Sequence, residues 1–159
     1  MKKQLVIALS LLLAPLTHAA IPKKLNAFSE GDRLVYTKLV EAYRKNQRAE
    51  AINQRRLLEK NYPQSVHLDN AYYLNAMLDF QEGRMADAVR GFGVVRERFP
   101  KSNKRPAAML AMAMSYQKLG LRPQSVRVLN LIRKEYPGSP ESVRAGMHLR
   151  MEKVNSVKR

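Results

Sequence analysis

The sequence has no cysteine and no tryptophan, and only 13 acidic residues stand against 29 lysines and arginines. Without cysteine the 159-residue chain can form no disulfide, bind no metal through thiolates and offer no thiol nucleophile. It also has no thiol to carry the lipid of a bacterial lipoprotein. Hydrophobic packing must therefore stabilise the fold, and the chain is long enough to bury a core of its own.

Long apolar runs are also scarce, and the clearest covers residues 5–13. It follows the basic Lys2 and Lys3 and precedes Thr17-His18-Ala19, an order typical of a secretory signal peptide cleaved after Ala19. The alternative, a membrane anchor, needs about 20 apolar residues, roughly twice this length. We therefore expect residues 1–19 to be a cleavable leader and the protein to be periplasmic or secreted.

The formal net charge of +16 falls to +14 when Lys2 and Lys3 leave with the leader. A strongly basic protein of the cytoplasm would be a candidate for nucleic-acid binding, but export argues against nucleic acid as a partner. The polyanions beyond the cytoplasm are anionic lipid head groups, acidic wall polymers and acidic faces of proteins. A solvated basic surface that only keeps the protein soluble is the alternative, and the sequence leaves both open.

A repeat organises the rest of the chain. One junction motif recurs every 37 residues, as Tyr62-Pro63-Gln64-Ser65, Phe99-Pro100-Lys101-Ser102 and Tyr136-Pro137-Gly138-Ser139. Two further columns keep the same register: Ala51, Ala88 and Ser125, and Asn46, Gly83 and Gly120. So regular a spacing is typical of a helical-repeat protein.

Each column of the repeat has a structural role. Proline ends a helix, and the serine two residues later is a favourable N-cap for the next one. Gly83 and Gly120 stand where a first helix must stop and turn, because glycine adopts left-handed dihedral angles at little cost. Between these signals, apolar residues recur every three or four positions, as in amphipathic helices. The unit is therefore helix, tight turn, helix and a Pro-Ser junction.

The pattern predicts an all-α fold without a sheet, made of about three helical hairpins and a C-terminal capping helix. The expected helices cover residues 31–45, 48–61, 67–82, 85–98, 105–119, 122–135 and 140–154. The repeats span about 30–65, 66–102 and 103–139 of a single domain, 30–154, whose last part, 140–154, is the cap. Residues 20–29 are expected to form a flexible arm and residues 155–159 a basic tail.

These columns resemble the tetratricopeptide repeat (TPR) family. The second unit has Tyr72, Ala76, Gly83, Ala88, Phe92 and Pro100 where that family prefers a large aromatic, a small residue, glycine, alanine, an aromatic and proline. The third unit has Met109, Ala113, Gly120, Ser125, Leu129 and Pro137. The first departs further, with Val35, Leu39, Asn46, Ala51, Arg55 and Pro63. The resemblance implies a right-handed solenoid whose units exceed the common length of about 34 residues.

The long unit with its Tyr-Pro-x-Ser junction resembles a narrower group. Residues 70–149 are similar to the C-terminal TPR domain of the Tol–Pal-associated cell division coordinator. They are more distantly similar to the TPR lipoprotein of the outer-membrane barrel-assembly machine. Unlike these groups, the chain has neither a coiled-coil segment that would form trimers nor a cysteine that would carry a lipid. A monomer without a membrane anchor is therefore favoured.

In the fold that the chain resembles, the first helices of successive hairpins line a concave face. The resemblance places on that face Arg33, Tyr36, Val40, Tyr43, Arg44, Asn70, Tyr73, Met77, Phe80, Gln81, Ala107, Leu110, Met114, Gln117 and Lys118. Aromatic and methionine side chains make strong and adaptable contacts, so this composition favours a surface for a peptide with some acidic residues. The alternative is that these side chains pack internally.

The last expected helix combines two features. An apolar stripe of Val143, Met147, Met151 and Val154 is expected to seal the last hairpin, as solenoids require. The basic residues near it are candidates for contact with anions: Arg144, Arg150, Lys153, Lys158 and Arg159. A basic amphipathic helix that lies on an anionic membrane is thus the second interpretation of this segment.

Signals for catalysis are absent from the sequence. No HExxH, GxSxG or phosphate-binding loop occurs, and His67 and His148 are the histidines left after export. We therefore expect no enzyme, no catalytic residue, no cofactor and no metal. The function that we expect is a protein–protein interaction scaffold in the bacterial cell envelope that binds a partner segment on its concave face, in a cell-division or outer-membrane maintenance complex. The alternative is a basic envelope protein that binds anionic lipid head groups or acidic wall polymer.

Overall fold

The computed structural model describes residues 30–157, and over that range it contains seven helices and no strand. The helices are α1 (Glu30–Arg44), α2 (Arg48–Asn61), α3 (Leu68–Gln81), α4 (Met85–Arg98), α5 (Arg105–Lys118), α6 (Arg122–Glu135) and α7 (Pro140–Val157). The all-α prediction is confirmed, with helix ends within three residues of those expected. The expected leader (1–19), the expected arm (20–29) and residues 158–159 lie outside the described residues.

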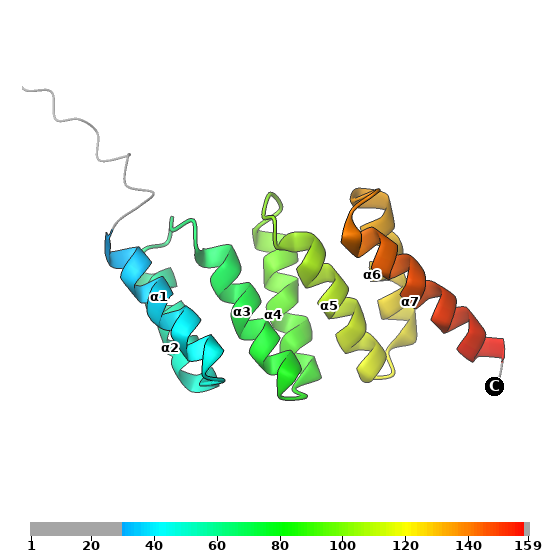
Figure 1. Ribbon diagram of the computed structural model, residues 1–159, viewed down its shortest axis with the longest axis horizontal. Coiled ribbons are helices and arrows are strands. Elements are labelled where there is room, and N and C mark those ends of the chain that lie inside the picture. The colour runs from blue at the N-terminus through cyan, green and yellow to red at the C-terminus, as the bar shows by residue number, and fades with distance from the viewer. Residues whose placement is uncertain (1–29, 158–159) are drawn as a thin grey trace, which may run out of the picture.

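The helices stack side by side in two layers (Figure 1). The first helices of the hairpins, α1, α3 and α5, form one layer with α7, and in it each helix approaches the next. Among the described residues, the backbones of α2, α4 and α6 in the other layer do not approach one another closely. The more closely spaced layer is the inner side of a curved stack, so the first helices line the concave side.

The tight turns inside the hairpins follow the prediction from the glycine column. Gly83 and Gly120 adopt φ angles of 76° and 73°, and Asn46, in the same place one unit earlier, adopts 54°. Glycine enters this left-handed region freely, and asparagine is one of the few other residues that tolerate it. The column therefore marks the place where each first helix ends.

The serines of the junctions differ in their roles. Ser139 caps α7 as predicted, because its hydroxyl accepts a hydrogen bond from the backbone N–H of Ser142 at 3.0 Å. Ser65 and Ser102 accept instead from the N–H two residues further on, at 3.2 and 3.0 Å. The N-cap prediction is wrong at these two positions, because a turn closed by backbone hydrogen bonds separates each serine from its helix.

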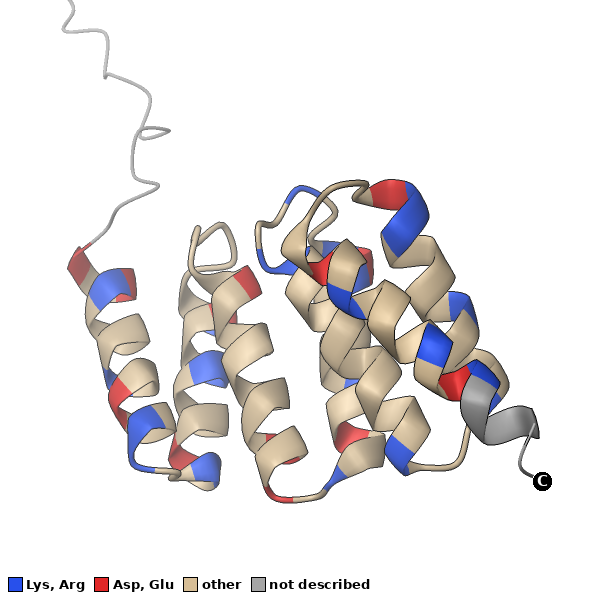
Figure 2. Ribbon diagram, turned by 45° about the vertical axis from the view of Figure 1, so that its right-hand side comes forward, with Lys and Arg blue, Asp and Glu red and all other residues tan. Residues whose placement is uncertain are grey.

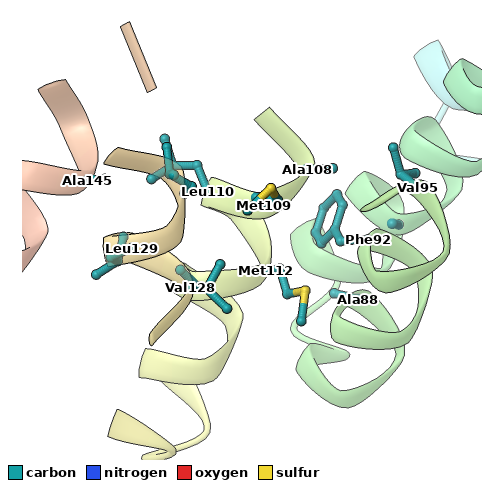
Figure 3. Close-up of a cluster of buried hydrophobic side chains, with 13 residues drawn as sticks. Ala88, Phe92, Val95, Ala108, Met109, Leu110, Met112, Val128, Leu129 and Ala145 are labelled. Carbon is teal, nitrogen blue, oxygen red and sulfur yellow. The ribbon is translucent and has the colours of Figure 1, made fainter. Parts of the chain in front are cut away.

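The largest hydrophobic cluster runs from α3 to α7 and is centred on the columns that carry the repeat (Figure 3). Its fully buried members include Ala88, Phe92, Met109, Ala113 and Leu129. Figure 3 shows Phe92 of α4 beside the methionines of α5. The residues that repeat in the sequence are thus those that join each helix to the next.

A polar network joins the first unit to the second. The hydroxyl of Tyr72 donates to Glu59 of α2 at 2.7 Å, and Arg98 of α4 donates to the same carboxylate at 2.8 Å. The guanidinium of Arg55 lies over the Tyr72 ring, 4.4 Å from its centroid. Burial raises the pKa of Glu59, but these hydrogen bonds and the charges of Arg98 and Arg55 outweigh burial, so that the pKa lies below its usual range.

The last helix packs through a different face from the one expected. Three residues expected to seal the last hairpin are 56%, 48% and 64% exposed, namely Val143, Met147 and Met151. The buried Ala145 and the partly buried Leu149 pack on the core instead. The sealing prediction is wrong because α7 keeps the orientation of α5, so that Ala145 takes the buried place of Ala108, 37 residues earlier. Val154, the fourth residue of the stripe, lies outside the described side chains.

The C-terminal boundary of the repeat domain also needs correction. α7 continues to Val157, so residues 155–157 of the expected basic tail belong to the helix. Within 30–157, no helix combines the length and apolar character that crossing a membrane requires.

Two glycines in open surroundings give a matched test of the turn. An added Cβ would meet nothing within 4 Å at either Gly83 or Gly93. Gly93→Ala lies within α4 and should raise the free energy of unfolding by about 1 kcal/mol, because alanine is the better helix former. Gly83→Ala should lower it by about 1–2 kcal/mol, because alanine is strained at positive φ. Urea denaturation measures the free energy of unfolding of both variants. Changes of the same sign would contradict the placement of Gly83 in a left-handed turn and of Gly93 within a helix.

The lowered pKa of Glu59 predicts a dependence of stability on pH. A carboxylate whose pKa is lower in the folded state stabilises the fold above its unfolded pKa, and this contribution is lost as the pH falls through the folded pKa. The difference in unfolding free energy between the wild type and Glu59→Gln should therefore be largest near neutral pH and shrink below about pH 4. Urea denaturation of both proteins at several pH values from below 4 to neutral measures this difference. A difference that does not change with pH would contradict the network around Glu59.

Candidate partner-binding groove

The structure brings the predicted groove residues together on the inner layer. They lie on α1 from Arg33 to Arg44, on α3 from Asn70 to Gln81 and on α5 from Ala107 to Lys118. The large apolar side chains among them are partly buried, neither sealed in the core nor fully exposed: Tyr36, Val40, Tyr43, Tyr73, Met77, Phe80 and Met114. Their role in binding a partner stays a prediction.

Contacts between α1 and α3 form the N-terminal part of the groove. The Tyr36 ring stacks on His67, with centroids 4.3 Å apart and planes 6° from parallel. The Asn70 amide donates to the Tyr36 hydroxyl, and the Gln81 amide donates to the Tyr43 hydroxyl at 3.5 Å. These hydroxyl and amide groups are thus paired within the protein, beside the rings of Tyr36 and Tyr43.

Between α3, α5 and α7 the groove deepens into a hollow of about 210 Å³. Six predicted groove residues line it: Tyr73, Met77, Phe80, Ala107, Leu110 and Met114. Leu110 is buried, so it forms part of the floor, while the others are partly buried. One water molecule occupies about 30 Å³ in the liquid, so the volume of the hollow equals that of several water molecules. It therefore has room for a side chain of a partner.

Tyr73 connects the hollow to the core. Its ring packs on Phe92 with centroids 5.9 Å apart. Burial raises the pKa of the Tyr73 hydroxyl, and the nearby Tyr43 and Glu141 add to this effect. The phenol therefore stays protonated and can donate a hydrogen bond to a partner that enters the hollow.

Charged groups stand at the rim of the hollow. The Lys118 ammonium lies 5.7 Å from the centroid of the Phe80 ring. Arg144 and Glu141, both on α7, line the hollow on its C-terminal side. This part of the groove thus combines an apolar floor with two cations and one carboxylate.

The other predicted residues are divided between solvent and intramolecular contacts. Arg33 and Arg44 are exposed on α1, as expected for the rim of a groove. Gln117 donates a hydrogen bond to Glu152 of α7 at 3.0 Å, so it helps to hold the last helix in place, and its role in binding a partner stays a prediction.

The groove continues beyond the residues that the sequence predicted. Met147 and Met151 on α7 take the register positions of Leu110 and Met114, 37 residues earlier, and both are exposed. The signal was available, because extending the register by one more unit places these methionines in the groove column. The sequence pattern instead assigned Met147 and Met151 to the apolar stripe that packs on the last hairpin.

The basic residues predicted to contact anions fall on two sides of α7. Arg144 belongs to the groove, as its lining of the hollow shows. Arg150 and Lys153 lie on the opposite flank, where they meet Arg122 and Arg133 of α6. Lys158 and Arg159 lie outside the described residues. The described members of this set therefore lie on two sides of α7, and their role in binding anions stays a prediction.

No group of three or more His, Asp or Glu side chains that could hold a metal occurs among residues 30–157. The arrangement of the groove, with rings and thioethers over an apolar floor, is suited to binding a polypeptide.

Comparison with known families agrees with this arrangement. The family model of the tetratricopeptide repeat matches residues 107–139, which cover most of α5, all of α6 and the junction after it. The comparison with curated proteins gave no match. The match shows a tetratricopeptide repeat in the third unit, and the first two units repeat its helix–turn–helix geometry. Tetratricopeptide repeats generally serve as protein-interaction modules.

Proposed function

We propose that the protein is a non-catalytic adaptor of the bacterial cell envelope that holds a segment of another envelope protein in its groove. The observation that carries the proposal is the row of partly buried aromatic and methionine side chains on the inner layer, including Tyr73, Met77 and Phe80. Side chains of this kind supply much of the binding energy of protein interfaces once a partner excludes water from them.

The chemistry of the groove defines the partner segment. Its floor is apolar, and cations stand at both ends, with Arg33 and Arg44 on α1 and Lys118 and Arg144 around the hollow. A segment with one large apolar side chain for the hollow and acidic residues toward the rim complements both features. Either an extended or a helical conformation satisfies this pattern.

The proposed location rests on the leader, Lys2 to Ala19, and the proposed process on the Tyr-Pro-x-Ser junctions. Those junctions resemble the repeats of envelope proteins that act in cell division and outer-membrane assembly. A division or outer-membrane maintenance complex is therefore the setting that we propose. The chain would act in it as a monomer that joins other components.

Cross-linking tests the groove. A photoreactive amino acid at position 77, in place of Met77, should capture the partner in intact cells. The additional change Phe80→Ala with Met114→Ala should reduce capture by about tenfold or more, because each truncation removes an interface anchor. Unchanged capture by this variant would reject the groove as the binding surface.

The control uses an apolar residue on the other layer. Leu57 is exposed on α2, outside the groove. The photoreactive amino acid at position 57 should not capture the same partner, and Leu57→Ala should leave capture at position 77 unchanged. Circular dichroism should show the same helix content for every variant.

Export is tested separately. We expect the mature protein recovered from the envelope to begin at Ala20, because cleavage is predicted after Ala19. N-terminal sequencing measures this directly. Replacement of Leu9 and Leu11 by arginine should retain the protein in the cytoplasm with residues 1–19 attached, and normal export of that variant would exclude a signal peptide.

A further inference from the structure

Within the described residues, the last helix of the solenoid, α7, is a first helix that no second helix covers. α7 follows a Ser139 junction and packs beside α5 and α6 as a first helix does, with Ala145 buried like Ala108 in the preceding unit. In each earlier unit the first helix is covered by a second, as α5 is by α6. Within residues 30–157 no such helix follows α7, so one flank of α7 has no helical neighbour.

A hollow of about 670 Å³ lies on this flank of α7. It lies between α6 and α7 and is lined by Arg122, Val126, Asn130, Arg133, Gly146, Leu149, Arg150, Glu152 and Lys153. Subtracting one unit of 37 residues from four lining residues of α7 gives Met109, Met112, Ala113 and Tyr116 of α5. These belong to or pack on the cluster that joins α5 to α6, so the hollow is in the register of a second-helix site.

The hollow differs from the earlier second-helix sites in charge. Arg150 replaces the apolar Ala113, and Arg133 of α6 adds a second cation. Glu152 is the one carboxylate among the lining residues, and it is already paired with Arg122. Figure 2 shows basic segments at this C-terminal end of the stack. The lining therefore carries an excess of positive charge that an acidic group would neutralise.

The apolar and the basic side chains that line the hollow differ in their exposure to solvent. Val126 and Leu149 are partly buried, whereas Arg133, Arg150 and Lys153 are exposed. A helix that only caps the solenoid and keeps it soluble needs no large hollow bordered by cations, because like charges close to one another repel. A flat lipid surface also fits poorly into a recess between two helices, whereas a helix fits the space that a repeat partner would occupy.

We propose that this hollow is a docking site for an acidic amphipathic helix of a partner protein, which completes the fourth hairpin. Its small apolar stripe packs on Val126 and Leu149, and its carboxylates pair with Arg133 and Arg150. Gly146 leaves room for close approach, because the nearest atom to a Cβ added there is Arg133 Nε at 3.9 Å. This surface lies on the flank of α7 opposite the groove, so the proposal is independent of the groove's partner.

The probe is a designed helical peptide of 14 residues, the length of α6, with leucines on one stripe and three glutamates beside it. Fluorescence anisotropy measures its affinity for the mature protein. We expect binding that weakens about tenfold with Arg133→Glu combined with Arg150→Glu, and about tenfold when the peptide's glutamates are replaced by glutamine. Binding should also weaken as the salt concentration rises, because the ion pairs are screened.

The matched control is Arg56→Glu with Lys60→Glu, which changes net charge equally on exposed residues of α2. This variant should bind the peptide like the wild type, and circular dichroism should show that both variants keep their helices. Equal loss in the two variants would overturn the proposal in favour of unspecific attraction. Failure of the wild type to bind the peptide would also overturn the proposal. So would displacement of the bound peptide by phosphatidylglycerol vesicles, if the vesicles bind the wild type but not the Arg133→Glu, Arg150→Glu variant.

Discussion

The structure depends on the contact of each helix with the next, because single helices of this length do not persist in water. α2 to α6 each have 14 residues, about the length at which isolated helices are marginal. Small residues set the distance between neighbours: a Cβ on Gly91 of α4 would lie 2.7 Å from that of Ala76 on α3. Close approach at such points allows the larger side chains, such as Phe92, to fill the space between successive helices.

The groove follows from this packing. Once the repeated columns are committed to neighbouring helices, the remaining inner-layer positions are free to differ between units. The column that starts at position 36 contains Tyr36, Tyr73, Leu110 and Met147, and so changes from aromatic to flexible aliphatic side chains along the stack. Rigid rings at one end and adaptable thioethers at the other give a single surface with two kinds of contact.

The sequence predicted the helices closely, because proline at each junction and Gly83, Gly120 and Asn46 in the turns act through local backbone geometry. It also placed the groove residues on the correct helices, since position within a repeat determines the layer. It failed where neighbours decide the outcome. The turn after Ser65 and the meeting of Arg133 with Arg150 depend on how α7 and the junctions pack, which no local pattern specifies.

α7 forms a wall of two recesses, since Glu141 and Arg144 line the groove while Gly146 and Arg150 line the terminal hollow. Because it packs on one flank only, it should open at a smaller free-energy cost than the central helices, and its amides should exchange with solvent before those of α4 or α5. A ligand that fixes α7 from either side reduces the entropy cost left for the other. The two recesses are therefore linked thermodynamically even if neither changes its shape.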